Sequence, residues 1–194
     1  MSNALLDKLA AYKIKYPEEF ETVARFVSLI TIHPNCFERD CWAGHITGSA
    51  WLVDAKANKI LLTHHKKLER WLQLGGHSDG DANTLNVALR EAWEESGLNV
   101  VPYEDARLKA GELFDVDVHE IPARREDPAH FHFDIRFVLQ VQGSENYTVS
   151  DESHDLAWVA TDELESYTRE ESIMRMHKKW LQLKKRAPEA PLNI

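Results

Sequence analysis

Three glutamates near the end of one helical segment are the residues of this chain best suited to chemistry. Glu91, Glu94 and Glu95 fall within the run Arg90 to Leu98. At about 100° per residue, a helix places their side chains within an arc of about 100° on one face. Carboxylates so close repel one another, and the negative end of the helix dipole adds to that repulsion. A bound hard cation would relieve both effects, whereas a solvated acidic face is the alternative.

The neighbours of these glutamates favour the cation. Arg90 lies one turn before Glu94 and can pair with it. A glycine turn at Gly75 and Gly76 precedes the helix and could lend a backbone carbonyl as a ligand. Mg²⁺ suits such a site because it takes oxygen ligands, keeps some of its waters and binds substrate phosphates.

At these residues the sequence resembles the Nudix hydrolase family. Its characteristic box reads G-x5-E-x7-R-E-U-x-E-E-x-G-U, where U is a bulky apolar residue. Ala92 fills the first apolar position, which is a mild departure. The larger departure is Ala82, which stands where the box has its first glutamate, although the adjacent Asp81 could take over part of that role. The matching residues are Gly76, Arg90, Glu91, Glu94, Glu95, Gly97 and Leu98.

The resemblance implies an α/β fold, a Nudix-type α/β/α sandwich with a mixed sheet, and hydrolysis of a nucleoside diphosphate linked to a group X. It implies Mg²⁺ as the cofactor, with Mn²⁺ as a substitute. Glu91 and Glu95 are then metal ligands together with the Gly75 carbonyl. Glu94 lies close to the cations or their waters and counts as both a ligand and a catalytic residue. Arg90 should orient the carboxylates. The cations would screen the diphosphate and lower the pKa of an attacking water.

A second acidic segment precedes Trp158. Nudix enzymes often take a further acidic ligand or base from a loop on this side of the fold. The resemblance therefore favours Glu152 as a catalytic residue, with Asp151 in reserve. A plain polar turn fits the segment 150–155 equally well.

Ten histidines are a high number for this length, and several stand in alternating strands. Along 131–141 the odd positions are all apolar, while the even positions are largely polar. We predict that this polar face binds substrate, with an exposed sheet face as the alternative. His77 follows the glycine turn and could approach a phosphate. The predicted substrate-binding residues are His77, His130, His132, Asp134 and Arg136.

Side chains of this kind hydrogen-bond hydroxyl groups well, so a nucleoside diphosphate sugar or ADP-ribose is the expected substrate. Pyrophosphohydrolysis of a nucleoside triphosphate is the second candidate. A non-catalytic Nudix-fold binding or regulatory module, suggested by Ala82, is the third, and an interaction domain acting through the N-terminal helices is another. A zinc site of Cys36, Cys41 and a histidine is conceivable, but the spacing matches no common structural pattern.

The remaining pattern assigns the elements that position these residues. Residues 1–38 form a predicted N-terminal helical appendage, in which an apolar stripe (Phe20, Val23, Val27 and Ile30) packs on the main domain or on a second subunit. The Nudix domain is predicted at 39–186 and a loose tail at 187–194. Its expected strands are a hairpin at 45–54 and 59–63, a strand running into the glycine turn at 72–76, and strands at 112–120, 131–141 and 157–159. Its expected helices are one at 83–96 ended by Gly97, one starting at 161–163 and a last one at 171–185. In the helix at 83–96, the side chains expected to be buried are Leu85, Leu89, Ala92 and Trp93.

Composition limits the partners. The 194 residues are 43% hydrophobic and carry a net charge of −9, so broad nucleic-acid binding is not expected. The longest apolar stretch, 26–32, is too short to span a membrane. No signal-peptide pattern is present, and Cys36 and Cys41 form no disulfide framework. We therefore expect a cytoplasmic protein, and the family resemblance suggests a homodimer.

Overall fold

The computed structural model describes residues 2–124 and 127–185, so the tail predicted at 187–194 lies outside the described residues. The elements, in chain order, are α1 (Ser2–Lys15), the short 3-10 helix η1 (Pro17–Glu19), α2 (Phe20–Ile32), β1 (His45–Val53), β2 (Lys59–His65), β3 (Arg70–Leu72), β4 (Leu74–His77), α3 (Thr84–Ser96), β5 (Val100–Pro102), β6 (Asp115–Ile121), β7 (His130–Val141), β8 (Ser153–Ala160), α4 (Leu164–Tyr167) and α5 (Glu171–Lys185). All the segments expected as helices or strands are therefore present, with shifted boundaries.

One eight-stranded mixed sheet forms the centre of the molecule. β1 and β7 run parallel to each other, in register from His45 opposite His132 to Val53 opposite Gln140. Every other strand pair is antiparallel: β4 and β2 pair with β1, β6 and β5 with β7, and β3 and β8 with β2. The predicted hairpin of β1 and β2 holds only near the turn, since β2 then leaves β1 to pair along its length with β8. The prediction of a turn at Gly75 and Gly76 is wrong, because both residues lie inside β4.

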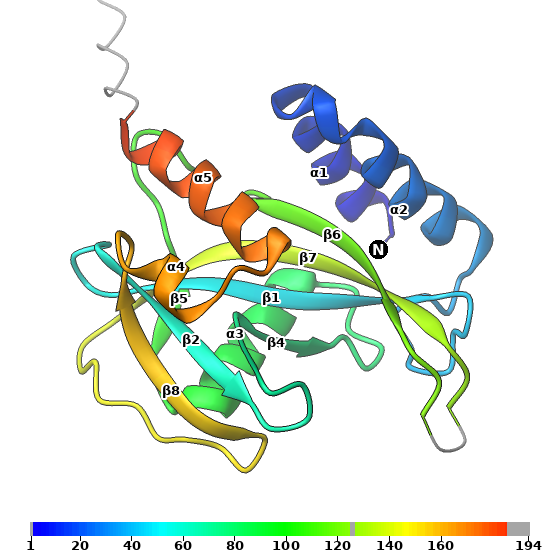
Figure 1. Cartoon of the computed structure of the whole chain (residues 1–194). Helices are drawn as coiled ribbons and strands as arrows, with labels where there is room; N and C mark the ends of the chain where they lie inside the picture. Colours follow the sequence, from blue (N-terminus) through cyan, green and yellow to red (C-terminus); the bar gives the residue numbers. More distant parts are fainter. Residues whose placement is uncertain (1, 125–126, 186–194) are drawn as a thin grey trace, which may run out of the picture.

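Helices cover both faces of this sheet, and Figure 1 shows α3 below β1 and α5 above it. Met176 and Trp180 of α5 belong to the same hydrophobic cluster as Trp51 of β1. On the other face, α3 lies directly on β1 at Gly48, where an added Cβ would come within 2.7 Å of the Thr84 carbonyl oxygen. α3 ends where predicted, at Gly97 in the left-handed conformation (φ +69°). The expected sandwich is thus observed.

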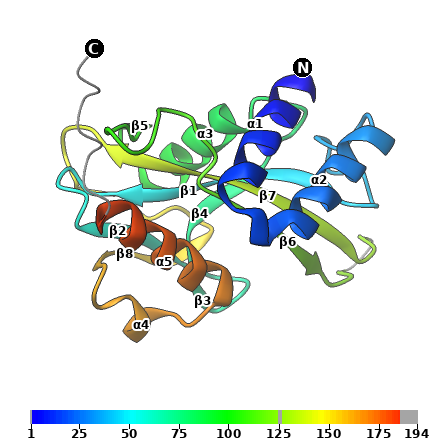
Figure 2. The ribbon, with the colours of Figure 1, turned by 90° about the horizontal axis from the view of Figure 1, so that it is seen from above.

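The N-terminal helices share the main hydrophobic core. Figures 1 and 2 place α1 and α2 beside β6 and β7. The ring of Phe26 meets that of Phe133 edge to face, with centroids 5.1 Å apart. Val23 and Ile30 of the predicted stripe are buried, but Phe20 and Val27 are exposed. The helix is turned so that Phe26 and Leu29 complete the buried face, and the stripe finds its partner within the same chain. The domain boundary near residue 38 stays a prediction.

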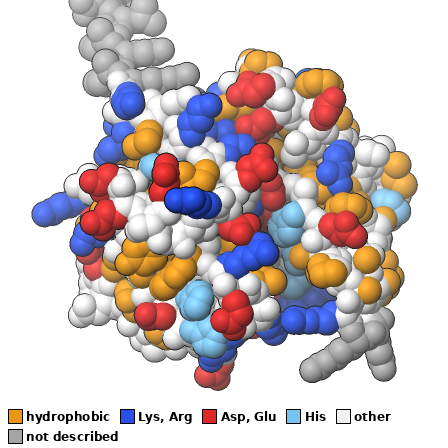
Figure 3. Space-filling model, viewed as in Figure 1, with side chains coloured by type: hydrophobic (Ala, Val, Ile, Leu, Met, Phe, Trp, Pro, Cys, Tyr) orange, Lys and Arg blue, Asp and Glu red, His pale blue; other side chains and the backbone are white. Residues whose placement is uncertain are grey.

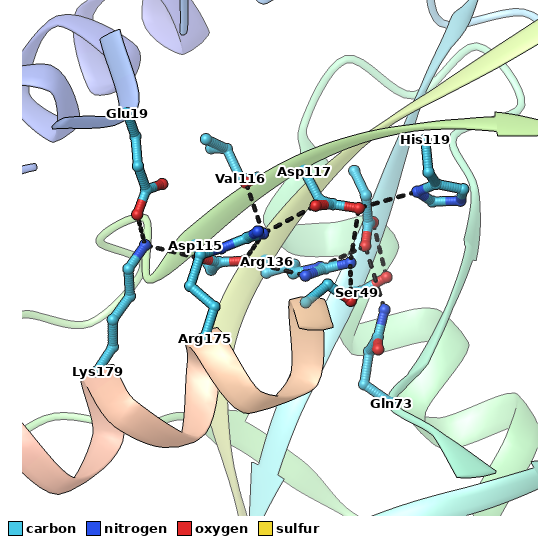
Figure 4. A network of polar contacts seen from close by, with 12 residues as sticks. Glu19, Ser49, Gln73, Asp115, Val116, Asp117, His119, Arg136, Arg175 and Lys179 are labelled. Carbon is cyan, nitrogen blue, oxygen red and sulfur yellow. Dashed lines mark hydrogen bonds and ion pairs between the residues drawn. The ribbon is translucent and has the colours of Figure 1, made fainter. Parts of the chain in front are cut away.

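A buried lysine ties α5 to the N-terminal helices. Lys179 Nζ donates to the Tyr12 hydroxyl at 2.5 Å and lies 2.6 Å from Asp115 Oδ1 and 2.5 Å from Glu19 Oε1. These partners come from α1, β6 and η1, and Figure 4 shows Lys179 reaching between Glu19 and Asp115. Breaking a buried pair of this kind leaves an uncompensated charge, so the contact locks the helices in place. Within the described residues, no helix is both long and apolar enough to cross a membrane.

We predict that Phe26→Ala lowers the free energy of unfolding by about 3–5 kcal/mol, because it opens a cavity in the shared core. Phe20→Ala on the same helix removes the same ring from a side chain that is 52% exposed, and should cost less than about 1 kcal/mol. Urea denaturation of both variants makes the comparison. Equal losses would show that α2 does not pack as described.

Candidate active site

Two of the three glutamates on α3 face the sheet rather than the solvent. A Cβ added at Gly76 would lie 2.3 Å from Glu91 Oε2, so only glycine leaves room for that carboxylate. The Gly75 N–H donates to Glu95 Oε1 at 2.7 Å. Gly75 itself has φ +156°, and an added Cβ would collide with Ser49. Gly76 therefore leaves the space for the Glu91 carboxylate, and Gly75 supplies the backbone N–H that binds Glu95.

This arrangement corrects the predicted buried side of the helix. Trp93 was expected in the core but is 58% exposed. Ala92 is buried as predicted, and Val87 and Ala88 are fully buried as well, so the buried arc is centred about 150° away from Trp93, on the side of Glu91 and Glu95. The amphipathic pattern misleads here because two carboxylates occupy positions at the edge of the core.

The electrostatics of the two inward-facing glutamates differ from those of Glu94. Burial raises the pKa of Glu95 to about 8, and the negative charges of Glu91 and Glu152 add to the effect, against the opposing Gly75 N–H. Burial also raises the pKa of Glu91, while Arg90 opposes it. The side chain of Glu94 is half exposed. Glu91 and Glu95 are thus half-buried carboxylates with a single nearby positive charge, that of Arg90 at Glu91, and a bound cation would supply the charge that is missing.

Arg90 joins the helix to β4. Its Nη2 donates to the His77 carbonyl oxygen at 2.6 Å and to Glu91 Oε1 at 3.0 Å. Its Nε lies 3.9 Å from Glu94 Oε1. A guanidinium fixed in this way can orient both carboxylates, as the family resemblance implies for this position.

The segment before α3 shows what replaces the missing box glutamate. Asp81 Oδ1 accepts a hydrogen bond from the Asn83 N–H at 2.8 Å, so its carboxylate stabilises the turn into the helix. Ala82 is half-buried beside it. Participation of Asp81 in metal binding stays a prediction.

Glu152 lies in the turn before β8, with its side chain exposed. The Lys66 N–H donates to its backbone oxygen at 3.1 Å, which anchors the turn to the end of β2. Its charge is close enough to contribute to the raised pKa of Glu95, so the loop approaches the carboxylates of α3. Asp151 is in the same turn, and its carbonyl oxygen accepts from Lys66 Nζ at 2.9 Å.

The polar face of β7 forms a buried network rather than an open surface. Asp134 and Arg136 are 2% and 1% exposed. Arg136 donates through Nε to Asp134 at 2.7 Å and through Nη1 to Asp115 at 3.0 Å. Asp134 also accepts the hydroxyls of Thr47 and Ser49 on β1. Figure 4 shows Arg136 between Ser49 and the aspartates. Since their charges are satisfied internally, Asp134 and Arg136 hold the sheet together here, and their contact with a substrate stays a prediction.

The same network extends to α5 through Arg175. Burial favours the neutral form of Asp115, but the hydrogen bond from Arg175 and the charges of Arg136 and Lys179 outweigh it and hold the pKa of Asp115 below its ordinary value. Asp117 behaves in the same way, with His119 and Arg175 among the groups that lower its pKa. These acids are therefore ionised and paired, unlike Glu95.

A cleft of about 770 Å³ opens beside this network. It is bounded by β6, the turn between β2 and β3 and the first turn of α5. In the space-filling view, acidic, basic and histidine side chains gather around a hollow on this side of the molecule (Figure 3). The polar lining includes Lys67, Arg70, Gln73, His119, Glu171 and Arg175. Of the predicted substrate-binding residues, Arg136 alone is among the described residues that line it.

The predicted histidines gather at the other end of the polar face. His77 and His132 are brought together with His45, the first residue of β1, and His130 lies beside them. Sequence reasoning did not select His45. No local signal could have selected it, because its position follows from the register of β1 against β7.

The family model of the NUDIX domain matches residues 45–181 of this chain. The match covers more than half of the sequence, and the chain belongs to the Nudix family. Over 99 residues it is 28% identical to a probable DHNTP pyrophosphohydrolase of Lactococcus lactis subsp. cremoris (strain MG1363), covering 50% of this chain and 55% of that relative. The chain thus matches only about half the length of this curated relative.

Solved structures show the same fold. An Ap4A hydrolase of C. elegans, solved as a binary complex, superposes with a TM-score of 0.55 at 12% identity, covering 72% of this chain and 96% of that chain. A MutT protein of Methanosarcina mazei Go1 gives a TM-score of 0.55 at 17% identity, covering 74% and 96%. At such identities the likeness concerns the fold, and it confirms the sandwich expected from the sequence.

The pKa of Glu95 predicts a measurable pH dependence of stability. An unfolded glutamate has a pKa near 4.5, whereas the folded chain holds Glu95 protonated up to about pH 8. The folded state binds the proton more tightly, so the stabilising contribution is present below about pH 4.5 and is lost as the pH rises to 8. In metal-free buffer, the stability advantage of Glu95→Gln over wild type should grow across this window, by on the order of a few kcal/mol.

Urea denaturation at a series of pH values, with a chelator present, measures this difference. Glu94→Gln is the control, because its half-exposed side chain should give a nearly constant difference. A constant difference for Glu95→Gln as well would contradict the buried, charge-disfavouring environment described for Glu95.

Proposed function

We propose that this protein is a Mg²⁺-dependent pyrophosphohydrolase that cleaves a nucleoside diphosphate linked to a group X. One observation carries the proposal. Glu91 and Glu95 are held against the glycines of β4 with raised pKa values and with Arg90 as their nearby positive group. Burying two carboxylates in this way costs stability, so their position is explained best by a ligand that only the folded chain can bind.

The donor set fits a magnesium ion. Carboxylate oxygens of Glu91 and Glu95 and the backbone carbonyl of Gly75 are hard oxygen ligands, and Glu94 at the solvent side can bind a second ion or its waters. Mn²⁺ takes the same ligands and is the expected substitute. When bound, the cation supplies charge neutralisation for the diphosphate and lowers the pKa of a nearby water.

The chain's own residues then have distinct tasks. Arg90 keeps the glutamates oriented through its bonds to Glu91 and to the His77 carbonyl. Glu152, exposed in the turn before β8 and near Glu95, is the proposed general base or additional ligand. Asp151 of the same turn is its reserve.

The cleft supports a substrate that carries hydroxyl groups as well as phosphate. Its lining mixes Lys67, Arg70 and Arg175 with acidic and amide side chains, which can serve a phosphate and a sugar ring together. We therefore propose a nucleoside diphosphate sugar or ADP-ribose as the substrate. Asp134 and Arg136 mainly position the strands that line this cleft. His77, His130 and His132 remain the proposed polar contacts to the substrate on the β4 side. Homodimer formation and a cytoplasmic location are further predictions.

A nucleoside triphosphate is the second candidate substrate, and a non-catalytic binding module is the alternative function. The Lactococcus relative is named as a probable pyrophosphohydrolase, and this supports a catalytic function for this chain. Ala82 supports the non-catalytic alternative, because the first glutamate of the box is missing. The retained Arg90 and the crowded glutamates favour the enzyme.

Removing the carboxylates tests the proposal. Glu91→Gln and Glu95→Gln should each lower kcat/KM by at least about 100-fold at saturating Mg²⁺, because a neutral amide is a poor ligand and leaves the diphosphate charge unscreened. Phosphate-release assays on a nucleotide panel, with and without Mg²⁺, measure the effect. Arg169→Gln, an exposed change outside the cleft lining, should retain wild-type activity. Wild-type protein inactive on the whole panel would favour the non-catalytic module.

Relative kcat/KM across the panel decides the substrate class. Sugar nucleotides and ADP-ribose should exceed nucleoside triphosphates by at least about tenfold, because the cleft gives hydrogen bonds to hydroxyl groups that triphosphate tails lack. Arg70→Gln in the cleft should raise KM for the preferred substrate, whereas Arg169→Gln should not. A preference for triphosphates would refute the sugar assignment and leave the hydrolase assignment intact.

A further inference from the structure

Three histidines from three strands meet at one end of the polar face of the sheet. His45 of β1 is paired in register with His132 of β7, and His77 of β4 lies opposite Thr47 of β1. Side chains two residues apart on a strand share a face, so the three imidazoles project to the same side. The chain places them together only through its tertiary fold, since they are 32 and 55 residues apart along the chain (77 − 45 and 132 − 77).

The geometry of the three rings is compact. Their centroids are 4.8 Å apart for His45 and His132, 4.9 Å for His77 and His132, and 5.1 Å for His45 and His77. One ring nitrogen from each histidine lies within 4.8 Å of the other two. Tetrahedral zinc ligands at about 2.0–2.1 Å from the ion have nitrogens roughly 3.3 Å apart, so small ring rotations close the triangle.

His45 is the independent sign of a ligand. Its side chain is 2% exposed, and in the described part of the chain neither ring nitrogen has a hydrogen-bond partner. The Cys41 backbone lies nearby but outside hydrogen-bonding geometry. A buried polar group left unpaired destabilises the folded state, and two such nitrogens on one ring need an explanation. A metal ion bound to one of them is an explanation that also accounts for the neighbouring rings.

The three rings are enclosed by the fold. His45 is buried and His77 and His132 are half-buried, and an uncharged imidazole in such a place offers a lone pair to a metal ion. His130 Nδ1 contacts the Pro128 carbonyl oxygen at 2.8 Å, and His119 Nδ1 contacts Asp117 Oδ2 at 3.0 Å. These contacts fix the orientation of His130 and His119, whose rings lie beside His45 and His132.

This cluster is separate from the glutamates of α3. Gly76 faces Glu91, and side chains alternate along β4, so His77 leaves the strand on the opposite face. The ligand chemistry also differs, because neutral imidazoles select zinc and related transition metals while Mg²⁺ takes oxygen ligands. The cysteines do not contribute: Cys36 and Cys41 are buried thiols, and among the described residues they join no group with metal-ligand spacing.

We propose that His45, His77 and His132 bind one divalent transition-metal ion of the zinc class, with a fourth position left for water or His130. The ion joins the start of β1 to β4 and β7. It thereby fixes β4, the strand that also carries Gly75 and Gly76. The site shares His77 and His132 with the proposed substrate contacts, but zinc binding and hydrolysis are measured separately, so either assignment can fail without the other.

Zinc titration of the full-length, chelator-stripped protein tests the site, with a chromophoric chelator as competitor and excess Mg²⁺ present to occupy the carboxylates. Wild type should bind one equivalent of Zn²⁺ in the micromolar range or tighter, and Zn²⁺ should raise the thermal midpoint further than Mg²⁺ alone. His77→Gln and His132→Gln should each weaken binding by at least about tenfold. His154→Gln, an exposed histidine outside the cluster, should leave it unchanged.

Two further measurements keep the outcome decisive. The Glu91→Gln, Glu95→Gln double variant should retain the Zn²⁺ equivalent, and Co²⁺ substitution should give the visible bands of nitrogen and oxygen ligation without sulfur charge transfer. Circular dichroism shows whether each variant is folded. If His132→Gln does not fold, His77→Gln, at a partly exposed position, still tests the site. Absence of a tight equivalent in wild type, binding unaffected by both histidine variants, or binding lost in the glutamate double variant would each overturn the proposal.

Discussion

The parallel pairing of β1 with β7 is the constraint on which the other features depend. Its register sets His45 beside His132, Thr47 beside Asp134 and Ser49 beside Arg136. Because side chains alternate, one face of these strands is apolar and accepts α1, α2 and α3, while the other carries a polar row. A shift of one residue in either strand would place Asp134 and Arg136 in the apolar core, so burial enforces the register strongly.

Buried charge is balanced in one part of this protein and unbalanced in another. Asp115, Asp134 and Arg136 satisfy one another within the chain, with Lys179 and Arg175 closing the network toward the helices. Glu91 and Glu95 have no equivalent supply of positive charge, and His45 has no hydrogen-bond partner among the described residues. The balanced groups stabilise the scaffold, and the unbalanced ones are where the fold is prepared for a ligand.

The sandwich and the glutamate segment were predictable from local patterns. Apolar periodicity, the C-capping Gly97 and the alternation along β7 depend on neighbouring residues, so they indicate elements before any packing is known. Local patterns failed where tertiary packing sets the orientation. Trp93 was assigned to the core, and Phe20 to the buried stripe, because a helix of mixed polarity has more than one plausible inward face. The position of β4 against α3 chose the face that holds Glu91 and Glu95.

By itself, the sequence determined that this is a Nudix-family α/β chain and that its carboxylates lie on the helix from 84 to 96. This was possible because the glutamates lie on consecutive turns of one helix, so their spacing along the sequence predicts that they share a face. The tertiary structure alone decided that the glutamates face glycines, that Asp134 and Arg136 are enclosed, and that His45 joins His77 and His132. Those relations depend on strand register and on contacts between distant segments, and no periodicity within one segment contains that information.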